Sequence, residues 1–356
     1  MTNTEGVKTA QSDVTISGDS VTSSASEGSS AVSTAVATKI ESSVSKTEAN
    51  AKYDAAEVVL PSFDDSIVAR IGTNGYTSLN AAYSKVNAGN TIVILNDVPN
   101  TELTGICIQK VITVDLNGHT VSGSGYTLSG KNYGWTFYVY KGSLTINDSS
   151  EHKTGKIIGT SRGISCANNG SVTINGGTVE GEECGIFSSS GTVTINDGTV
   201  VGNKYGIWAY EDTKAYIHGG EIIGKVEGVE LNSSSSLEMD KGRIVVENND
   251  PTKESFGILA TNSSVTISNA AIIMNNNPDV TTFKDQYSWA ISIVLSDLTV
   301  EGGTIISTND AKHTLRIDGL STKTITGGKF SQDVSEFLSS GYKAVENDGV
   351  WEITAA

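Results

Sequence analysis

A short alternation of apolar and polar residues, closed by Asn or Asp and Gly, recurs along most of this chain. The clearest copies are Val172-Thr173-Ile174-Asn175-Gly176-Gly177 and Val193-Thr194-Ile195-Asn196-Asp197-Gly198. Nine apolar anchor residues mark the copies, at spacings of 21 to 33 residues. The anchors are Leu116, Ile146, Ile174, Ile195, Ile217, Met239, Ile267, Val300 and Ile325. Repeats of this length are typical of solenoids and arrays.

Each repeat predicts three short strands separated by tight corners. Alternate side chains of a strand point to opposite faces, so we expect Val172 and Ile174 to face inward and Thr173 outward. A β-branched pair follows, as in Thr178-Val179, and then a Gly with an aliphatic residue, as in Gly185-Ile186. The Asn-Gly and Asp-Gly pairs supply the positive φ that tight corners require. The sequence therefore predicts an all-β fold, a right-handed parallel three-sheet β-helix with small α/β caps at both ends.

The composition divides the chain into four parts. Residues 1–55 are rich in Ser, Thr and Ala, which favours a disordered or stalk segment. Residues 56–110 should form the N-terminal cap, with strands at 67–71 and 91–95 around an amphipathic helix at 78–86. The β-helix should then span residues 111–326. Residues 327–356 should form the C-terminal cap, a short helix at 334–338 and a hairpin around Asn347-Asp348-Gly349.

Several segments resemble a known family. The runs 76–82, 91–98 and 112–121 are similar to the entry into pectate-lyase-like parallel β-helix domains of bacterial cell-surface and secreted proteins. The segments 327–331 and 342–345 resemble the C-terminal cap of those domains. The resemblance implies the fold and a secreted or cell-surface location, with a signal peptide and anchor outside this sequence. It implies no single activity, because that family mixes adhesins, polysaccharide-active enzymes and other proteins.

Charge, hydropathy and cysteine content narrow the functional classes. A net charge of -16 argues against nucleic acid as a partner, because nucleic-acid binding needs a basic surface. The chain contains no run of about 18 apolar residues, so the sequence predicts no membrane-spanning segment. Cys166 should face the core and Cys184 should lie in a corner, about 13 Å apart along adjacent coils. That distance exceeds the roughly 7 Å that a disulfide allows, so we expect all three cysteines to be free.

Catalytic and metal signatures are weak. Polygalacturonase-like enzymes of this fold carry Gly-His-Gly and Arg-Ile-Lys motifs, whose nearest matches here are Gly118-His119-Thr120 and Arg316-Ile317-Asp318. The four His residues lack the spacing of metal ligands. Four corner carboxylates align loosely and leave Ca²⁺ binding possible, although Asp is also a common turn residue. They are Asp115, Asp148, Asp197 and Asp240. We therefore predict no catalytic residue, metal site or cofactor.

Long connections in the C-terminal half form the first candidate surface. Insertions fall between the second and third strands of three successive coils, at residues 247–256, 274–289 and 307–313. Because stacked coils place these loops on one edge, we expect a binding surface there, with Trp289 as its anchor. Its candidate ligand-binding residues are Trp289, Tyr287, Phe283, Phe256, Asp279, Asp285 and Glu254. The alternative is that these loops only pack on themselves.

An aromatic stripe along the third strands forms the second candidate surface. Its residues are Trp208, Tyr210, Phe187 and Tyr138, at outward positions beside Glu230. Aromatic rings stack on sugars or anchor protein partners. Cross-strand packing that protects the sheet is the alternative interpretation.

The sequence favours a non-catalytic surface adhesin or binding module whose partner is a glycan or a host or cell-surface protein. Two alternatives stay open. One is a carbohydrate-active enzyme, either a glycoside hydrolase or a polysaccharide lyase, which would need paired carboxylates beside the aromatic rings. The other is a structural spacer.

Overall fold

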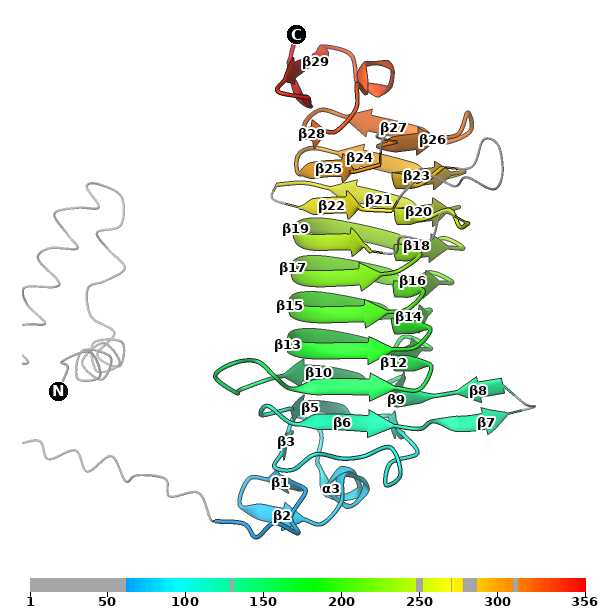
Figure 1. The fold of residues 1–356 in the computed structure, drawn as a ribbon. Coiled ribbons are helices and arrows are strands. Elements are labelled where there is room, and N and C mark those ends of the chain that lie inside the picture. Colours follow the sequence, from blue (N-terminus) through cyan, green and yellow to red (C-terminus); the bar gives the residue numbers. More distant parts are fainter. Residues whose placement is uncertain (1–61, 129–130, 248–251, 270, 278–286, 310–312) are drawn as a thin grey trace, which may run out of the picture. The chain divides into compact units, whose positions relative to one another are not determined.

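A computed structural model describes residues 62–356, except 129–130, 248–251, 270, 278–286 and 310–312. The part from residue 61 onward is one compact unit. This unit is a parallel β-solenoid of about nine turns, whose coils are stacked one above the next (Figure 1). The predicted stalk, residues 1–55, lies outside the described residues.

Two sheets carry the coils. Sheet B has nine strands, all paired in parallel with their neighbours. In spatial order these are β4 (Ile106–Ile108), β9 (Trp135–Tyr140), β12 (Arg162–Ala167), β14 (Cys184–Ser189), β16 (Tyr205–Tyr210), β18 (Glu227–Asn232), β20 (Phe256–Thr261), β23 (Trp289–Val294) and β26 (Leu315–Ile317). These strands correspond to the predicted third strands of the repeats.

Sheet A holds nineteen strands and contains the anchor residues. Its coil strands are β3 (Thr91–Ile94), β5 (Val111–Asp115), β6 (Thr120–Gly123), β10 (Ser143–Asn147), β11 (Lys156–Gly159), β13 (Ser171–Gly181), β15 (Thr192–Gly202), β17 (Lys214–Gly224), β19 (Ser236–Val246), β21 (Ser264–Ile267), β22 (Ile272–Asn275), β24 (Asp297–Val300), β25 (Thr304–Ser307), β27 (Thr322–Ile325) and β28 (Lys329–Phe330).

The prediction of three separate strands per coil is wrong for the central coils. There, β13, β15, β17 and β19 each run for 11 residues and contain both predicted strands. The expected corner is a bulge inside a continuous strand, with positive φ at Gly177 (76°) and Gly198 (91°). A bulge bends a strand without ending its pairing, so strand pairing defines two sheets rather than three. The right hand of the coil stays a prediction.

The anchor column is confirmed from its second member onward. Ile146, Ile174, Ile195, Ile217, Met239, Ile267, Val300 and Ile325 are stacked in register. The residue aligned below Ile146 is Val114, so the assignment of Leu116 as the first anchor is wrong. The strand ends at Asp115, and Leu116 is buried at the following corner, where its N–H donates to the Asn147 carbonyl at 2.8 Å.

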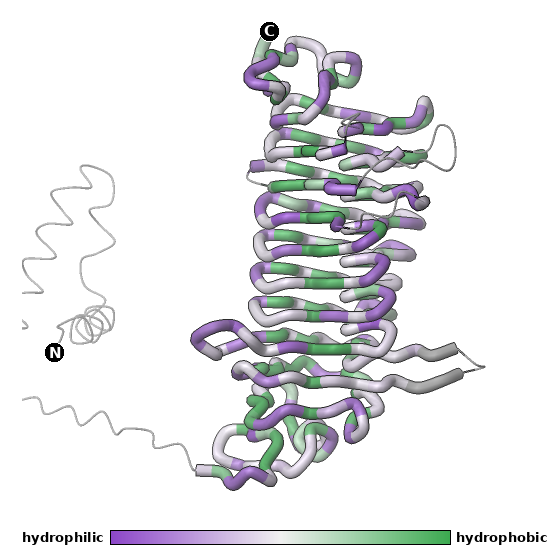
Figure 2. The backbone as a smooth tube through the Cα atoms, in the orientation of Figure 1, coloured by the Kyte–Doolittle hydropathy of each residue, from purple (hydrophilic) through white to green (hydrophobic). Residues whose placement is uncertain are grey.

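A second inward column runs along sheet B. Ile164, Ile186, Ile207, Val229, Ile258 and Ile291 are in register, and Phe137 and Leu315 extend the column. The apolar segments of the strands alternate with polar corners along every coil (Figure 2). Each fully buried aliphatic side chain contributes about 1.5 to 3 kcal/mol to folding. The continuous core therefore stabilises the whole stack.

The cysteines are free as expected, but Cys184 is the first residue of strand β14 and does not lie in a corner. Cys107, Cys166 and Cys184 are free, and the last two are fully buried. Burial raises the pKa of the Cys166 thiol to about 11 and that of Cys184 to about 12. Since the thiolate is the reactive form, these two thiols are inert at neutral pH.

Small elements flank the coils at both ends. At the N-terminal end, β1 (Ala69–Ile71) and β2 (Asn74–Tyr76) pair antiparallel and precede helix α3 (Leu79–Lys85). Ser78 caps this helix by accepting a hydrogen bond from the Ala81 N–H at 3.1 Å, close to the predicted start. At the other end lie η1 (Ser335–Phe337), β29 (Tyr342–Asn347) and β30 (Val350–Ala355).

The last two strands form the predicted hairpin, and β30 also pairs antiparallel with β28. Its turn residues Asp348 and Gly349 both have positive φ, as a two-residue hairpin turn requires. A further hairpin, β7 (Tyr126–Leu128) with β8 (Lys131–Tyr133), projects from the coils (Figure 1). Within the described ranges, no helix is long and apolar enough to span a membrane.

Candidate functional site

A glycine at the second position of β12, β14, β16, β18 and β20 decides which side chains face outward. In β18, a Cβ on Gly228 would lie 2.2 Å from Ile244 Cγ2, so Gly228 faces the core. The next residue, Val229, is also fully buried in the core. Two successive inward positions break the strict alternation of a strand. The residue before the glycine and the residue two positions after it therefore lie on the same outer side.

Ring contacts confirm this geometry in the neighbouring strands. The ring centroids of Tyr205 and Trp208 on β16 are 5.2 Å apart. Those of Trp135 and Tyr138 on β9 are 5.3 Å apart. In each pair, one residue immediately precedes the glycine position and the other lies two positions after it. We refer to the outward side chains of sheet B as the aromatic face.

Two columns of aligned residues make up the aromatic face. The first column is Trp135, Arg162, Cys184, Tyr205, Glu227, Phe256 and Trp289. The second column is Tyr138, Ser165, Phe187, Trp208, Glu230, Leu259, Ser292 and Arg316. The two candidate surfaces of the sequence are therefore one surface, since Phe256 and Trp289 continue the column of Tyr205 and Glu227.

Aromatic residues gather at three places along this face. The first cluster is on β9, where Tyr138 packs between Trp135 and Tyr140. The second joins β14 and β16, where Trp208 contacts Phe187 and Tyr205 at centroid distances of 5.0 and 5.2 Å. Tyr210 follows on β16 and is 38% exposed.

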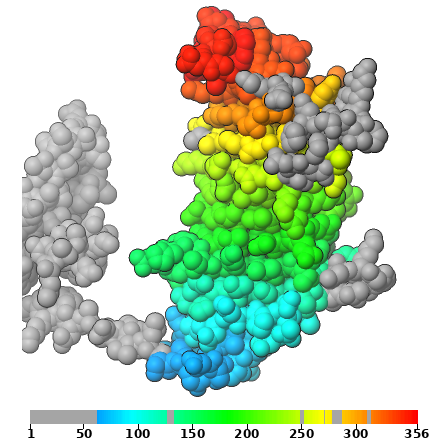
Figure 3. Space-filling model, viewed as in Figure 1, coloured from blue at the N-terminus to red at the C-terminus, as the bar shows by residue number. Residues whose placement is uncertain are grey.

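The third cluster lies at the C-terminal part of the face. The His313 ring packs at a tilt against Tyr287 and Trp289, at centroid distances of 4.3 and 4.6 Å. Trp208 on β16 lies three strand spacings from the first cluster on β9 and three from Trp289 on β23. At about 4.8 Å per spacing, neighbouring clusters lie roughly 14 Å apart along the stack. Figure 3 shows these coils as successive bands of colour.

Cations sit over the rings of the second cluster. The guanidinium carbon of Arg162 lies 3.9 Å from the centre of the Phe187 ring and 5.6 Å from that of Trp208. Arg162 Nε also pairs with Glu183 Oε2 at 3.4 Å. Lys204 Nζ lies 4.4 Å from the centre of the Tyr205 ring. The rings of this cluster therefore already bind positively charged groups through cation–π contacts.

A pair of carboxylates borders the second cluster. Glu227 is only 8% exposed and Glu230 is half-buried. Asn232 Nδ2 donates to Glu230 Oε1 at 2.6 Å. Burial and, to a smaller extent, the negative charge of Glu230 raise the pKa of Glu227 to about 8, against the lowering effect of the Lys204 ammonium group. At neutral pH Glu227 is therefore largely protonated.

Polar atoms without partners concentrate on the same face. Buried atoms without a hydrogen-bond partner are found on five of its residues, namely Ser165 Oγ, Trp208 Nε1, Glu227 Oε2, Glu230 Oε2 and Ser292 Oγ. Buried polar groups are nearly always hydrogen-bonded, because an unmade bond costs about 1 to 3 kcal/mol. Such atoms beside aromatic rings indicate a surface that is completed by a polar ligand or by water.

The ends of the three long connections meet beside the third cluster, as predicted. Ser255 Oγ donates to Ser288 Oγ at 2.9 Å, and Asn275 Nδ2 donates to the Ser255 and Trp289 carbonyls, both at 2.8 Å. Asn309 Nδ2 donates to the Ser288 carbonyl at 2.8 Å. This buried network fixes the backbone beside Trp289. Of the other candidates, Glu254 is half-buried, whereas Phe283, Asp279 and Asp285 lie outside the described residues.

A pocket of about 250 Å³ opens beside Trp289 at the C-terminal end of the face. Its polar and aromatic lining includes Arg316, Gln332, Asp333, Glu336 and Phe337. Aromatic side chains combined with planar polar groups suit a sugar residue. The role of Trp289 as an anchor stays a prediction. Its side chain lines this pocket, where a ligand could contact it.

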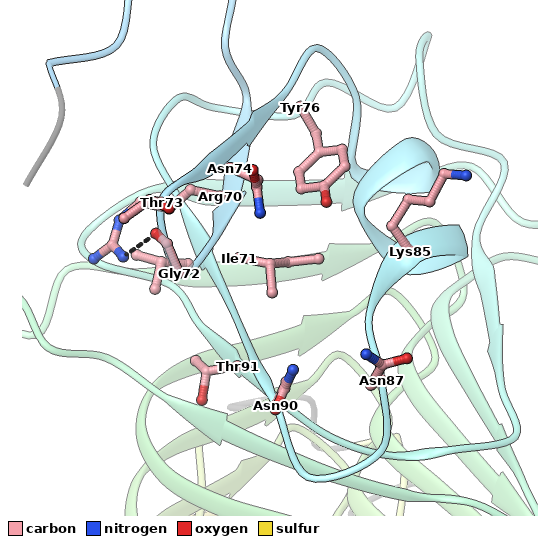
Figure 4. A pocket seen from close by; sticks show the side chains of 11 residues that line it. Arg70, Ile71, Gly72, Thr73, Asn74, Tyr76, Lys85, Asn87, Asn90 and Thr91 are labelled. Atoms are coloured by element: carbon pink, nitrogen blue, oxygen red, sulfur yellow. Dashed lines mark hydrogen bonds between the residues drawn. The ribbon is translucent and has the colours of Figure 1, made fainter.

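A larger pocket, of about 620 Å³, lies at the N-terminal end (Figure 4). Arg70 and Lys85 contribute the cations of its lining, and Tyr76 contributes an aromatic ring. Arg70 Nη1 already donates to the Gly72 carbonyl at 3.1 Å. None of the five atoms without partners on the aromatic face lies in this pocket. The aromatic face is therefore the stronger candidate.

The corner carboxylates act as turn residues. Asp115 accepts from the Asn117 and Ser149 N–H groups at 3.0 and 2.8 Å, and Asp148 accepts from three backbone N–H groups. Asp197 accepts from the Gly198 N–H, and Asp240 contacts His218. No group of three or more His, Cys, Asp or Glu that could hold a metal ion occurs in the described part of the chain.

Sequence reasoning missed Arg162, Lys204, Tyr205, Glu227 and His313 as members of the site. Counting by two from inward Val229 would place Glu227 inside, whereas the structure places it outside because Gly228 takes an extra inward position. The aligned glycines at 163, 185, 206, 228 and 257 were the available signal.

No protein-family model, no curated protein and no solved structure matches this chain. The class of the protein, a parallel β-solenoid, therefore rests on its strand pairing alone.

Proposed function

We propose that this protein is a non-catalytic glycan-binding module, of the pectate-lyase-like β-helix type found on bacterial surfaces, and that it acts outside the cell or on its surface. The carrying observation is the line of three aromatic clusters on one sheet, with polar atoms that lack partners between them. Aromatic rings stack on sugar rings, and polar atoms pair with their hydroxyl groups.

The rigidity of the site supports this function. Every strand of the aromatic face is hydrogen-bonded to its neighbours, so the rings are held in place before a ligand arrives. Preorganised side chains lose little conformational entropy on binding. A regular, linear surface of this kind suits a linear polymer better than a compact protein partner.

A glycoside hydrolase is the second candidate, because one observation favours it. Glu227 and Glu230 are neighbouring carboxyl groups, and the pKa of Glu227 is raised mainly by burial, as an acid catalyst requires. Glu227 and Glu230 nevertheless project from the same side of one strand, β18, whereas a glycoside hydrolase needs two carboxyl groups that flank the glycosidic bond. Binding without turnover is therefore the function that the geometry supports best.

A glycan array combined with turnover assays tests the proposal. We expect the full chain to bind a defined subset of glycans and to release neither reducing ends nor unsaturated products from them. Turnover of a bound glycan would transfer the assignment to the hydrolase or lyase. Binding to a protein receptor with no binding to any glycan would contradict the proposal.

A further inference from the structure

The centre of the aromatic face contains two acidic side chains that lack a cationic partner in direct contact. Glu227 and Glu230 each have a buried Oε2 atom without a hydrogen-bond partner. Among the described residues, neither carboxylate takes part in an ion pair. Burying a carboxylate costs several kcal/mol unless a cation or hydrogen bonds compensate it. The pair is therefore incomplete as it stands.

The aromatic surroundings of this pair favour a cation. Tyr205 is aligned with Glu227 on the adjacent strand, and Trp208 is aligned with Glu230. Phe256 is aligned with Glu227 on the other side. A cation near these residues would gain from the ring faces as well as from the carboxylates.

The chain itself shows that an ammonium group fits beside these rings. Lys204 Nζ lies 4.4 Å from the centre of the Tyr205 ring. Its charge lowers the pKa of Glu227, against the larger raising effects of burial and of Glu230, so it lies close enough to act on the carboxyl group. Lys204 is exposed and forms no ion pair with either glutamate, so another ammonium could displace it.

We propose that Glu227, Glu230, Tyr205 and Trp208 form a subsite for a primary ammonium group carried by an amino sugar of the bound glycan. This inference rests on the proposed function and names the ligand class of the same face. The ammonium group would take the place of Lys204 Nζ and donate to the two free Oε2 atoms. Trp208 Nε1, the neighbouring donor without a partner, would donate to a hydroxyl oxygen of the same sugar.

Binding of an ammonium group should release a proton. Near neutral pH Glu227 is largely protonated, because burial and then Glu230 raise its pKa to about 8. A cation beside the carboxylate favours its ionised form, so the proton leaves when the ligand binds. The other titratable groups that face Glu227 are Glu230 on its own strand, Tyr205 on β16, and Lys204, which immediately precedes β16. From β20, the neutral Phe256 is aligned with it.

Calorimetric titration with two matched oligosaccharides tests the subsite. The probes are the fully deacetylated and the fully N-acetylated tetramers of glucosamine, at a slightly acidic pH where the free amines are protonated. We expect the full chain to prefer the deacetylated tetramer by at least about tenfold. Titrations in two buffers of different ionisation enthalpy should show proton release with this tetramer only.

Three variants locate the preference. Glu227→Gln and Glu230→Gln should each remove the preference for the deacetylated tetramer, and Glu227→Gln should also abolish the proton release. Glu238→Gln makes the same substitution at an exposed position on sheet A and should leave both unchanged. Lys204→Met removes the internal competitor without touching the core, so binding of the deacetylated tetramer should tighten by about threefold or more.

Several results would overturn the subsite. Equal affinity for the two tetramers would do so while leaving the glycan-binding function intact. Weaker binding by Lys204→Met would show that Lys204 contacts the ligand rather than competing with it. Preference for a lysine-rich peptide over the deacetylated tetramer would assign the ammonium group to a protein. Failure to bind any glycan of an array would instead overturn the proposed function, and the subsite with it.

Discussion

The outer faces of the two sheets enclose the same core but differ in chemistry. On sheet A, the outward column is Thr145, Thr173, Thr194, Tyr216, Glu238, Thr266 and Thr299. Next to it, Asn175 and Asn196 each donate to the preceding Asn of a ladder, at 2.9 and 2.8 Å. On sheet B, aromatic rings alternate with buried polar atoms that lack partners.

This difference indicates that the outer face of sheet A serves stability and that the outer face of sheet B serves binding. The polar groups of the Asn ladder satisfy one another across the coils, so that part of sheet A is complete without a ligand. The aromatic face leaves donors and acceptors unpaired, at a cost in folding free energy. Unpaired polar groups that reduce stability on only one face of a regular solenoid are expected at a binding site, where a ligand can pair with them.

The largest expected effect contrasts the inside of sheet A with its outside. Ile195→Ala should lower the free energy of unfolding by about 2 to 5 kcal/mol, because it leaves a cavity in the continuous anchor column. Thr194→Ala, the outward neighbour, should cost less than about 1 kcal/mol. Urea unfolding of both variants measures the difference. Similar losses for the two would contradict the inward and outward assignment.

The next effect contrasts the two outer faces in binding. Replacing Trp289 and Tyr287 together with Ala should weaken glycan binding by about 2 kcal/mol or more, with little change in the melting temperature. Tyr216→Ala on sheet A is the matched control and should leave the affinity unchanged. An equal loss from Trp208→Ala alone, with no effect at Trp289, would confine the site to the second aromatic cluster.

A smaller effect concerns the pH dependence of stability. The pKa of Glu227 is about 8 in the folded protein and near 4.5 when exposed, so the unfolded chain binds fewer protons between these values. The free energy of unfolding should therefore fall as the pH rises from about 4.5, the pKa of an exposed Glu, to about 8, the pKa of Glu227 in the folded protein. Glu227→Gln should flatten this decline in melting temperature, and Glu238→Gln should not. Parallel curves for wild type and Glu227→Gln would contradict the burial of an ionisable group there.

The smallest effect concerns the N-terminal segment. Residues 1–55 are predicted from composition to contribute little to the core. A chain that begins at Ala56 should therefore melt within a few degrees of the full chain, as measured by circular dichroism. Loss of folding on this truncation would show that the segment stabilises the solenoid.

Sequence patterns predicted the solenoid because its signals are local. The repeated anchors, the glycines at the start of the third strands and the helix start at Ser78 are each visible within a few residues. The structure confirms the anchors from Ile146 onward, the glycines and the helix start. Leu116 was misassigned because Leu116-Asn117-Gly118 imitates the later motif after the strand has already ended. The continuous strands of the central coils were missed because a bulge and a corner both use a positive-φ glycine.

The candidate site was only partly predictable. The outward positions of Phe187, Trp208 and Glu230 follow from alternation and are confirmed by the register. Simple alternation could not place Glu227 on the outer face, because Gly228 and Val229 both face inward and break the alternation. The union of the two candidate surfaces also depends on the alignment of Glu227 with Phe256 and of Phe256 with Trp289. No pattern within one repeat contains that information.

A crystal structure of the protein with its best-binding glycan tests the central claim most directly. The account predicts that the sugar chain lies on sheet B and contacts the rings of Trp208 and Trp289. A glycan bound to the outer side of sheet A, or in the N-terminal pocket beside Arg70 and Lys85, would contradict it.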